Sequence, residues 1–191
     1  MIERYIAFDV ETPSHANDRM SAIGIAVVEG GRIVEEHEAL VDPEVPFDLF
    51  NIRLTGIGPD QVAGAPTFPA LWREIRPLMD SGVLVAHNAP FDMSVLAKCL
   101  RGYGIRWHPT VRYACTCQMG RRLLPRLPDH RLDTLCRYLD VPLDHHRAGS
   151  DSRACGELLL HYLRSGADPA PFLRTYDLFH ARTLTGTGRR R

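Results

Sequence analysis

The sequence predicts an α/β protein with a mixed five-stranded sheet flanked by helices. A strand-like run at residues 5–10 is followed by two apolar runs joined by a Gly-Gly pair, which is typical of a hairpin. The wholly apolar run at residues 83–87 lies between two helical patterns, as expected for a strand buried on both faces. The order helix, buried strand, helix favours a mixed sheet over an all-β or all-α fold.

The first strand ends in two carboxylates. In "YIAFDVET", aromatic and β-branched residues favour an extended backbone, and residues two apart share a face, so Asp9 and Glu11 are neighbours. Two carboxylates in a partly dry site repel each other unless a proton or a cation, most often a divalent metal, lies between them. Alternatively the strand ends at Asp9 and both acids are solvated, which is the commoner outcome for a lone pair of this kind.

The next elements follow from turn residues and periodicity. Residues 21–41 give two strands, which form a meander with the first, and residues 42–66 are rich in Pro and Gly, so we expect an irregular loop there. A helix follows from Thr67, a plausible N-cap, to Gly82. After the buried strand, residues 88–104 predict a second helix that stops at glycine.

The second half predicts the last strand and three more helices, within residues 112–124, 131–141 and 150–166. From residue 167 onward the periodicity fades, and the chain ends in three arginines. We therefore expect a domain over residues 1–168 and a C-terminal extension over 169–191 with a basic tail. The tail is either simply frayed or a nucleic-acid contact that adds salt-sensitive affinity.

Composition indicates a globular protein. The chain has 191 residues, of which 45% are hydrophobic and 24% charged, which suits one domain with a sizeable core. No apolar run approaches the ~20 residues of a membrane span, and the N-terminus lacks a signal-peptide pattern, so we expect a cytoplasmic protein without a membrane partner. The formal net charge is zero, so any polyanion must bind a local patch.

The five cysteines are an odd number and contain no C-x-x-C pair, which fits reduced thiols better than a disulfide framework or a zinc site. Cys115 and Cys117 could ligate a metal, but a C-x-C pair without partners usually packs in the core.

Two further clusters contain acids at predicted helix starts. "HNAPFD" places Asp92 in the first turn of the helix after the buried strand, and "HHRAGSD" places Asp151 at the start of the last long helix, with His146 on the loop before it. Each has an ordinary explanation by itself. An acid is favourable at a helix N-terminus, and His146 could be an exposed loop residue.

Together the three clusters resemble a known family. Asp9-x-Glu11, His87-Asn88-x-x-Phe91-Asp92 and His146-x-Ala148-x-x-Asp151 are similar to the three motifs of the DEDDh family, the DnaQ-like 3′→5′ exonucleases with a ribonuclease H-like fold. "LTGI", "APTF" and "RLDTLCRYLDV" also match, so the resemblance covers residues 4–165. Members include proofreading subunits of DNA polymerases, ribonuclease T and oligoribonuclease.

The sequence departs from the family pattern in two places. Pro13 and Ser14 follow Thr12 where the family often continues with Thr-Gly, and "HRAGSDS" is polar where many members have Leu and Ala. Both departures affect the loop beside the terminal nucleotide and remove no ligand. His145 precedes His146, and the H-x-A-x-x-D spacing assigns the catalytic role to His146.

The resemblance implies a two-metal hydrolysis. Two divalent ions, Mg²⁺ or Mn²⁺, about 4 Å apart would place the attacking water and neutralise charge on the reacting oxygens, and carboxylates are the ligands that such hard ions prefer. Asp9 would bridge both ions, Glu11 and Asp151 would hold the nucleophile-side ion, and Asp92 the other. His146 would accept the proton from the water, because an imidazole titrates near neutrality.

The resemblance also implies a pocket for a single-stranded or frayed 3′ end of DNA or RNA, formed by Thr12, Leu54, Thr55, Asn88 and Phe91. The product would be nucleoside 5′-monophosphates, and a DNA polymerase is a possible partner through proofreading. Two alternatives remain open: a nuclease-fold module that binds nucleic acid or a polymerase without cleaving, and a metal phosphoesterase acting on small nucleotides. The sequence leaves the oligomeric state and the choice between DNA and RNA open.

Overall fold

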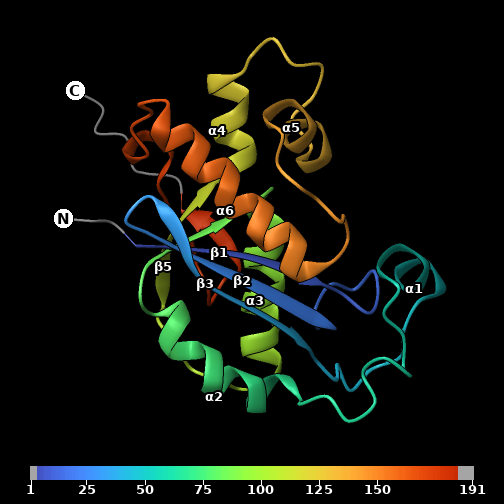
Figure 1. Cartoon of the computed structure of the whole chain (residues 1–191). Helices are drawn as coiled ribbons and strands as arrows, with labels where there is room; N and C mark the ends of the chain where they lie inside the picture. The colour runs from blue at the N-terminus through green and yellow to red at the C-terminus, as the bar shows by residue number, and fades with distance from the viewer. Residues whose placement is uncertain (1–3, 185–191) are drawn as a thin grey trace.

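The computed structural model describes residues 4–184. Its single sheet has seven strands in the order β3-β2-β1-β4-β5-β6-β7 (Figure 1). The strands are β1 (Tyr5–Glu11), β2 (Ala22–Glu29), β3 (Arg32–Leu40), β4 (Val83–Ala86), β5 (Thr110–Cys115), β6 (Arg174–Asp177) and β7 (Arg182–Leu184). β1, β4 and β5 are mutually parallel, and the other neighbours pair antiparallel, so the predicted mixed sheet is confirmed.

Helices cover both faces of this sheet. They are α1 (Leu49–Thr55), α2 (Phe68–Met79), α3 (Pro90–Gly102), α4 (Thr116–Leu123), α5 (Leu132–Leu139) and α6 (Ala148–Arg164), with a short 3₁₀ helix η1 (Ala170–Phe172). α2 and α3 cover one face and α4, α5 and α6 the other, while α1 lies apart from both layers (Figure 1).

The central strand β1 is buried on both faces because the helix layers enclose it. Ile6, Phe8 and Val10 pack in the core with α2 and α3. Tyr5 and Ala7 point the other way, into the core with α4, α5 and α6. Strand alternation therefore places Asp9 and Glu11 on the α6 side of the sheet.

The sheet has seven strands rather than the five that we predicted, and the additional two lie in the expected C-terminal extension. β6 pairs with β5 and β7 with β6, so residues 174–184 extend the sheet. Both strands are short, and Tyr176 is the one buried residue within the two strands, so the sequence shows no alternation of buried and exposed residues there. The domain boundary at residue 168 stays a prediction, and the terminal arginines lie outside the described residues.

A second difference is α1, which occupies part of the expected irregular loop. Leu49 and Phe50 are 70% and 72% exposed, so this helix has no apolar face directed at the core and no helical periodicity to read. The predicted helix from Thr67 does form, but it ends at Met79 rather than at Gly82, and the Thr67 side chain makes no capping hydrogen bond.

The outer edge of the sheet is strongly charged. β3 is an edge strand, and Glu35, Glu36, His37 and Glu38 on it are all exposed. Within residues 4–184, no helix has both the length and the apolar character that crossing a membrane requires.

Candidate active site

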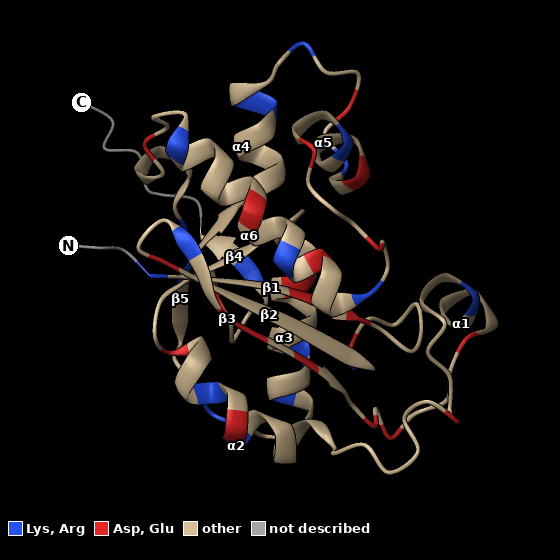
Figure 2. Ribbon diagram, in the orientation of Figure 1, with Lys and Arg blue, Asp and Glu red and all other residues tan. Residues whose placement is uncertain are grey.

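Three carboxylates meet where β1 ends. Oxygens of Asp9, Glu11 and Asp151 all lie within 4.8 Å of one another. Asp9 and Glu11 come from the end of β1, and Asp151 comes from the first turn of α6. Figure 2 shows these acidic positions of β1 and α6 side by side near the middle of the molecule.

Gly24 permits this close approach of α6 to the sheet. It pairs with Asp9 across β1 and β2, directly beneath the start of the helix. A Cβ at this position would lie 1.9 Å from the carbonyl oxygen of Ala148, the first residue of α6. Only a residue without a side chain allows the helix terminus, and with it Asp151, to reach the two acids of β1.

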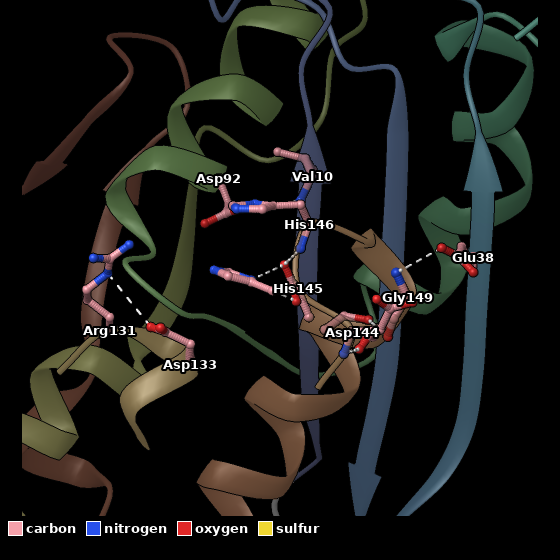
Figure 3. Close-up of polar contacts among 12 residues, drawn as sticks. Val10, Glu38, Asp92, Arg131, Asp133, Asp144, His145, His146 and Gly149 are labelled. Carbon is pink, nitrogen blue, oxygen red and sulfur yellow. Dashed lines mark hydrogen bonds and ion pairs between the residues drawn. The ribbon is translucent and has the colours of Figure 1, made fainter. Parts of the chain in front are cut away.

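The start of α6 is also held from the other side by β3. The backbone nitrogen of Gly149 donates a hydrogen bond to Glu38 Oε1 at 3.2 Å, as Figure 3 shows. An acid that accepts from the first turn satisfies a free helix N–H group and favours the helix dipole. Both contacts fix the position of the first turn of α6 relative to the sheet.

Asp92 reaches the same place from α3. The parallel pairing of β1 with β4 stops at Ala7 and Val85, so the outer part of β1 has no strand partner on that side. Asp92 Oδ1 accepts a hydrogen bond there from the backbone nitrogen of Val10 at 3.3 Å. The carboxylate of Asp92 therefore lies against the edge of β1, between its two acidic residues in sequence (Figure 3).

Burial and mutual repulsion make these four carboxyls hard to ionise together. Burial raises the pKa of Asp9 well above its usual value, and the charges of Asp92, Asp151 and Glu11 raise it further. Burial likewise raises the pKa of Glu11 to about 8 and that of Asp92 to about 8. The pKa of Asp151 is raised by burial too, although His145 opposes the shift.

The donor set fits divalent metal ions. Asp92, Asp151 and Glu11 are only 2%, 3% and 8% exposed, and such charges need a compensating cation. Among the described residues, the ion pair from His145 to Asp151 is the only one at these four acids. Carboxylate oxygens without a thiolate are what Mg²⁺ and Mn²⁺ favour. The five cysteines are buried and free, and none belongs to a cluster of candidate ligands in the described chain.

Asp151 also organises the two histidines before α6. His145 Nδ1 donates to Asp151 Oδ2 at 3.0 Å, and the backbone nitrogen of His146 donates to the same oxygen at 3.0 Å. The two imidazole rings stack with centroids 4.0 Å apart, as Figure 3 shows. His146 adopts a φ of 68°, a left-handed backbone conformation that is uncommon for a residue other than glycine.

The two histidines therefore have different surroundings. The His145 ring is tied to the carboxylate of Asp151, whereas the ring of His146 makes no hydrogen bond to any described residue. Burial and the neighbouring His145 lower the pKa of His146 below its usual value, so its imidazole is largely neutral near pH 7. A neutral ring with a free nitrogen can accept a proton.

His87 of the second motif has a structural role. Its Nε2 donates to the carbonyl of His130 at 3.0 Å, so Nδ1 is unprotonated and accepts from the Thr116 hydroxyl at 2.9 Å. Burial lowers the pKa of His87 to about 4, which keeps the ring neutral. Both nitrogens are occupied, and the ring holds the loop that contains His130 against the end of β4.

The residues expected to bind the 3′ end are distributed around this site. Thr12 is buried, and its hydroxyl donates to Asn17 Oδ1 at 3.0 Å, while Asn51 of α1 donates to its carbonyl at 2.9 Å. Thr55 Oγ1 donates to the carbonyl of Asn51, so its hydroxyl is already used within α1. Both threonines are thus held in internal networks.

The other three predicted binding residues are exposed. Asn88 has a φ of 61° and lines the same pocket as Asp9 and Asp151. Leu54 and Phe91 are large apolar side chains at the surface, on α1 and on the first turn of α3. An exposed apolar surface beside an acidic pocket suits a nucleotide base, and these binding roles stay predictions.

Three residues that contribute to this region were not identified from the sequence. Gly24 had a readable signal, because a glycine inside an apolar strand often marks a close backbone approach. Asn51 is buried and connects α1 to Thr12, but its role depends on a helix that the sequence did not reveal. Arg121 lines the pocket with Asp9 and Asp151, and only the tertiary fold brings it there.

This fold and this site are those of an exonuclease family with a ribonuclease H-like fold. The family model RNase_T, described as Exonuclease, matches residues 6–159. The chain therefore belongs to this family, which includes the DEDDh, DnaQ-like exonucleases, and the predicted family and fold are confirmed.

Curated relatives include large polymerases. DNA polymerase III PolC-type of Bacillus subtilis is 37% identical over 172 residues, which cover 87% of this chain and 12% of the relative. The corresponding protein of Oceanobacillus iheyensis is 37% identical over 162 residues, which cover 82% and 11%. The chain thus spans about one eighth of the length of the polymerases that it matches.

Solved structures agree with the fold. A structure described as exonuclease X in complex with 5′ overhanging duplex DNA is 26% identical, with a TM-score of 0.70 over 88% of this chain and 96% of that one. The nuclease domain of 3′hExo, described as a DEDDh family member bound to rAMP, is 18% identical, with a TM-score of 0.74 over 86% and 94%. The second similarity supports the fold alone.

Proposed function

We propose that this protein is a metal-dependent 3′→5′ exonuclease that hydrolyses phosphodiester bonds from the 3′ end of DNA or RNA and releases nucleoside 5′-monophosphates. The observation that carries the proposal is the convergence of Asp9, Glu11, Asp92 and Asp151 at the end of β1. The match to the exonuclease family supports the direction and the type of cleavage.

Each acid has a proposed place in the metal site. The charges of all three other acids act on Asp9, so Asp9 would be a ligand of both ions, Glu11 and Asp151 of one ion and Asp92 of the other. When bound, two Mg²⁺ or Mn²⁺ ions would lower the pKa of the attacking water and neutralise charge on the phosphate oxygens.

The chain's own residues would handle the proton and the substrate. His146 accepts the proton of the attacking water, since its ring is neutral near pH 7 and makes no hydrogen bond to another described side chain. Thr12 and Thr55 shape the pocket for the terminal sugar through their network with Asn51. Leu54 and Phe91 provide apolar surface for the last bases.

The relationship to PolC-type polymerases supports DNA and a proofreading role beside a polymerase. It also supports the expected cytoplasmic location. Exonuclease X, described in complex with duplex DNA, supports a DNA substrate too. RNA is the competing substrate, because the sequence leaves the choice between DNA and RNA open.

The test is hydrolysis of single-stranded DNA and RNA, labelled at either the 3′ or the 5′ end, with Mg²⁺, with Mn²⁺ and with a chelator. We expect metal-dependent loss of the 3′ label before the 5′ label, with nucleoside 5′-monophosphates as the product. The DNA-to-RNA ratio of rates identifies the substrate. Retained binding without cleavage would indicate a non-catalytic module, and cleavage restricted to dinucleotides would indicate a small-nucleotide phosphoesterase.

A further inference from the structure

A second cavity lies beside the active-site pocket on the C-terminal side of the sheet. It has a volume of about 490 Å³ and is formed by the start of α3, the strands β5 to β7, the helix α4 and η1. Three arginines line it, Arg121 and Arg122 of α4 and Arg174 of β6, and its lining contains no acidic residue. We call this cavity the arginine groove.

The arginine groove adjoins the active-site pocket. Arg121 lines both the groove and the pocket that contains Asp9 and Asp151. Asn88 lines the pocket, and Pro90, two residues further along the chain, lines the groove. A strand that leaves the acidic pocket past Asn88 and Arg121 would therefore run toward the groove.

The charges in the groove are not neutralised by carboxylates. Arg121 and Arg122 are exposed and form no ion pair or hydrogen bond within residues 4–184. Arg174 donates to the carbonyls of Pro171 and Leu173 at 2.8 Å each, and these contacts leave its positive charge unpaired. Figure 2 shows the basic positions at the C-terminal end of α4 without acidic neighbours on that helix.

Arginines on the other side of the molecule contrast with these. Arg153 pairs with Glu36 at 2.8 Å, and Arg147 pairs with Asp144 at 3.2 Å and with Glu38 at 3.6 Å. An unpaired cluster of arginines creates a local positive potential. The composition does not reveal this potential, because the chain as a whole has no net charge.

We propose that the arginine groove binds the phosphate backbone of the substrate strand on the 5′ side of the nucleotide being removed. This inference rests on the proposed exonuclease function. Guanidinium groups bind phosphate oxygens with paired N–H donors, so several unpaired arginines in one groove suit successive phosphates. Backbone contacts carry no sequence preference, which an enzyme that degrades any 3′ end requires.

The first test measures binding of a 5′-labelled single strand in the presence of a chelator, over a series of salt concentrations. The variants are Arg122→Ala and the double variant Arg122→Ala/Arg174→Ala, and the control is Arg73→Ala, an exposed arginine of α2 on the other face of the sheet. For a single strand, each lost phosphate contact reduces the slope of log affinity against log salt concentration by about 0.7. We expect this slope to fall by about 0.7 in Arg122→Ala and by about 1.4 in the double variant, and to stay unchanged in Arg73→Ala.

The second test compares turnover of a long single strand with that of a dinucleotide. The dinucleotide is too short to extend into the groove, so we expect the ratio of the two kcat/KM values to fall severalfold in the double variant. Thermal unfolding checks that the double variant still folds, because Arg174 contacts η1. Arg122→Ala alone removes a side chain that forms no hydrogen bond or ion pair within residues 4–184.

The outcomes separate this inference from the proposed function. Unchanged salt slopes and an unchanged ratio would overturn the arginine groove while leaving the exonuclease intact. If the wild-type protein cleaves neither substrate, the proposed function fails, and the binding measurement still decides whether the groove contacts the strand. Reduced capture of a polymerase with unchanged strand binding would assign the groove to a protein partner instead and overturn the inference.

Discussion

Gly24 lies directly beneath the carbonyl of Ala148, and a Cβ at this glycine would approach that oxygen to 1.9 Å. The contact joins the middle of β2 to the first residue of α6, which is the helix that contains Asp151. The geometry of the acidic site therefore depends on a residue that has no functional group.

The variant Gly24→Ala should damage activity more than stability. The nearest atoms are backbone atoms, so α6 must move away from the sheet, and such overpacking costs about 1–3 kcal/mol. The same movement withdraws Asp151 from Asp9, so we expect turnover to fall at least about a hundredfold, by analogy with other small misplacements of catalytic groups. Thermal unfolding and hydrolysis rates measure the two effects.

Gly102→Ala is the matched control for this change. The nearest atom to a Cβ at Gly102 is the Nη1 of Arg19, the end of a flexible side chain that can move aside. A variant at Gly24 with normal turnover would show that α6 need not lie so close to the sheet.

Asp9→Asn should abolish hydrolysis and stabilise the metal-free fold. Removing one of four acids that repel each other relieves the others, while loss of a bridging ligand removes several kcal/mol of transition-state stabilisation, or about a thousandfold in rate. Thermal unfolding in a chelator should show a higher Tm than the wild type, and Mn²⁺ should raise it less. Glu74→Gln, an exposed acid of α2, should change neither quantity. Wild-type turnover in Asp9→Asn would refute the assigned mechanism.

The stability of the metal-free protein should fall as the pH rises. The pKa of Glu11 is raised from 4.5 to about 8 in the folded protein, so the folded state retains a proton that the unfolded chain loses in this window. Since the folded state then binds more protons than the unfolded state, the free energy of unfolding decreases as the pH rises from about 4.5 to about 8.

Metal should remove this pH dependence, because the cation replaces the protons. Unfolding with a chelator and with Mn²⁺, near both ends of that pH window, measures the difference. We expect Mn²⁺ to raise the Tm at the alkaline end by at least about 3 °C more than at the acid end, which is roughly 1 kcal/mol for a protein of this size. An equal increase at both ends would contradict the assigned burial of these acids.

His146→Ala should slow the chemical step and leave metal binding largely intact. A general base contributes about 10²- to 10⁴-fold to the rate, and the His146 ring forms no hydrogen bond to a described carboxylate, although its ring nitrogen lies within 4.8 Å of an Asp151 oxygen. His145→Ala is the informative comparison, because His145 Nδ1 donates to Asp151. We expect weaker metal binding in the His145 variant and slower single-turnover hydrolysis in the His146 variant. An equal loss of metal affinity in both would count against the base role.

The sequence predicts the elements that bury regular apolar patterns. The strand ending at Asp9, the buried strand before His87 and the helices that begin near Asp92 and Asp151 were all expected, because their periodicity reflects packing against a core. α1, β6 and β7 were missed because few of their side chains are buried, and such segments carry little periodicity.

The candidate site could be assembled from motifs, but its geometry could not. Asp9, Glu11, Asp92 and Asp151 are identifiable from their resemblance to the family motifs, whereas the hydrogen bond from Val10 to Asp92 depends on where the pairing of β4 with β1 stops. The same limit applies to Arg121, since nothing local connects it to residues 30 or more positions away.

The charged residues of β3 have a consequence for the behaviour of the protein at high concentration. An edge strand presents unpaired backbone groups that can recruit a strand from another molecule and start aggregation. Glu35, Glu36 and Glu38 are exposed along this edge, and charged side chains on an edge strand discourage the addition of another strand. We therefore expect sheets of neighbouring molecules not to join through β3, which leaves the rest of the surface for contacts with other chains.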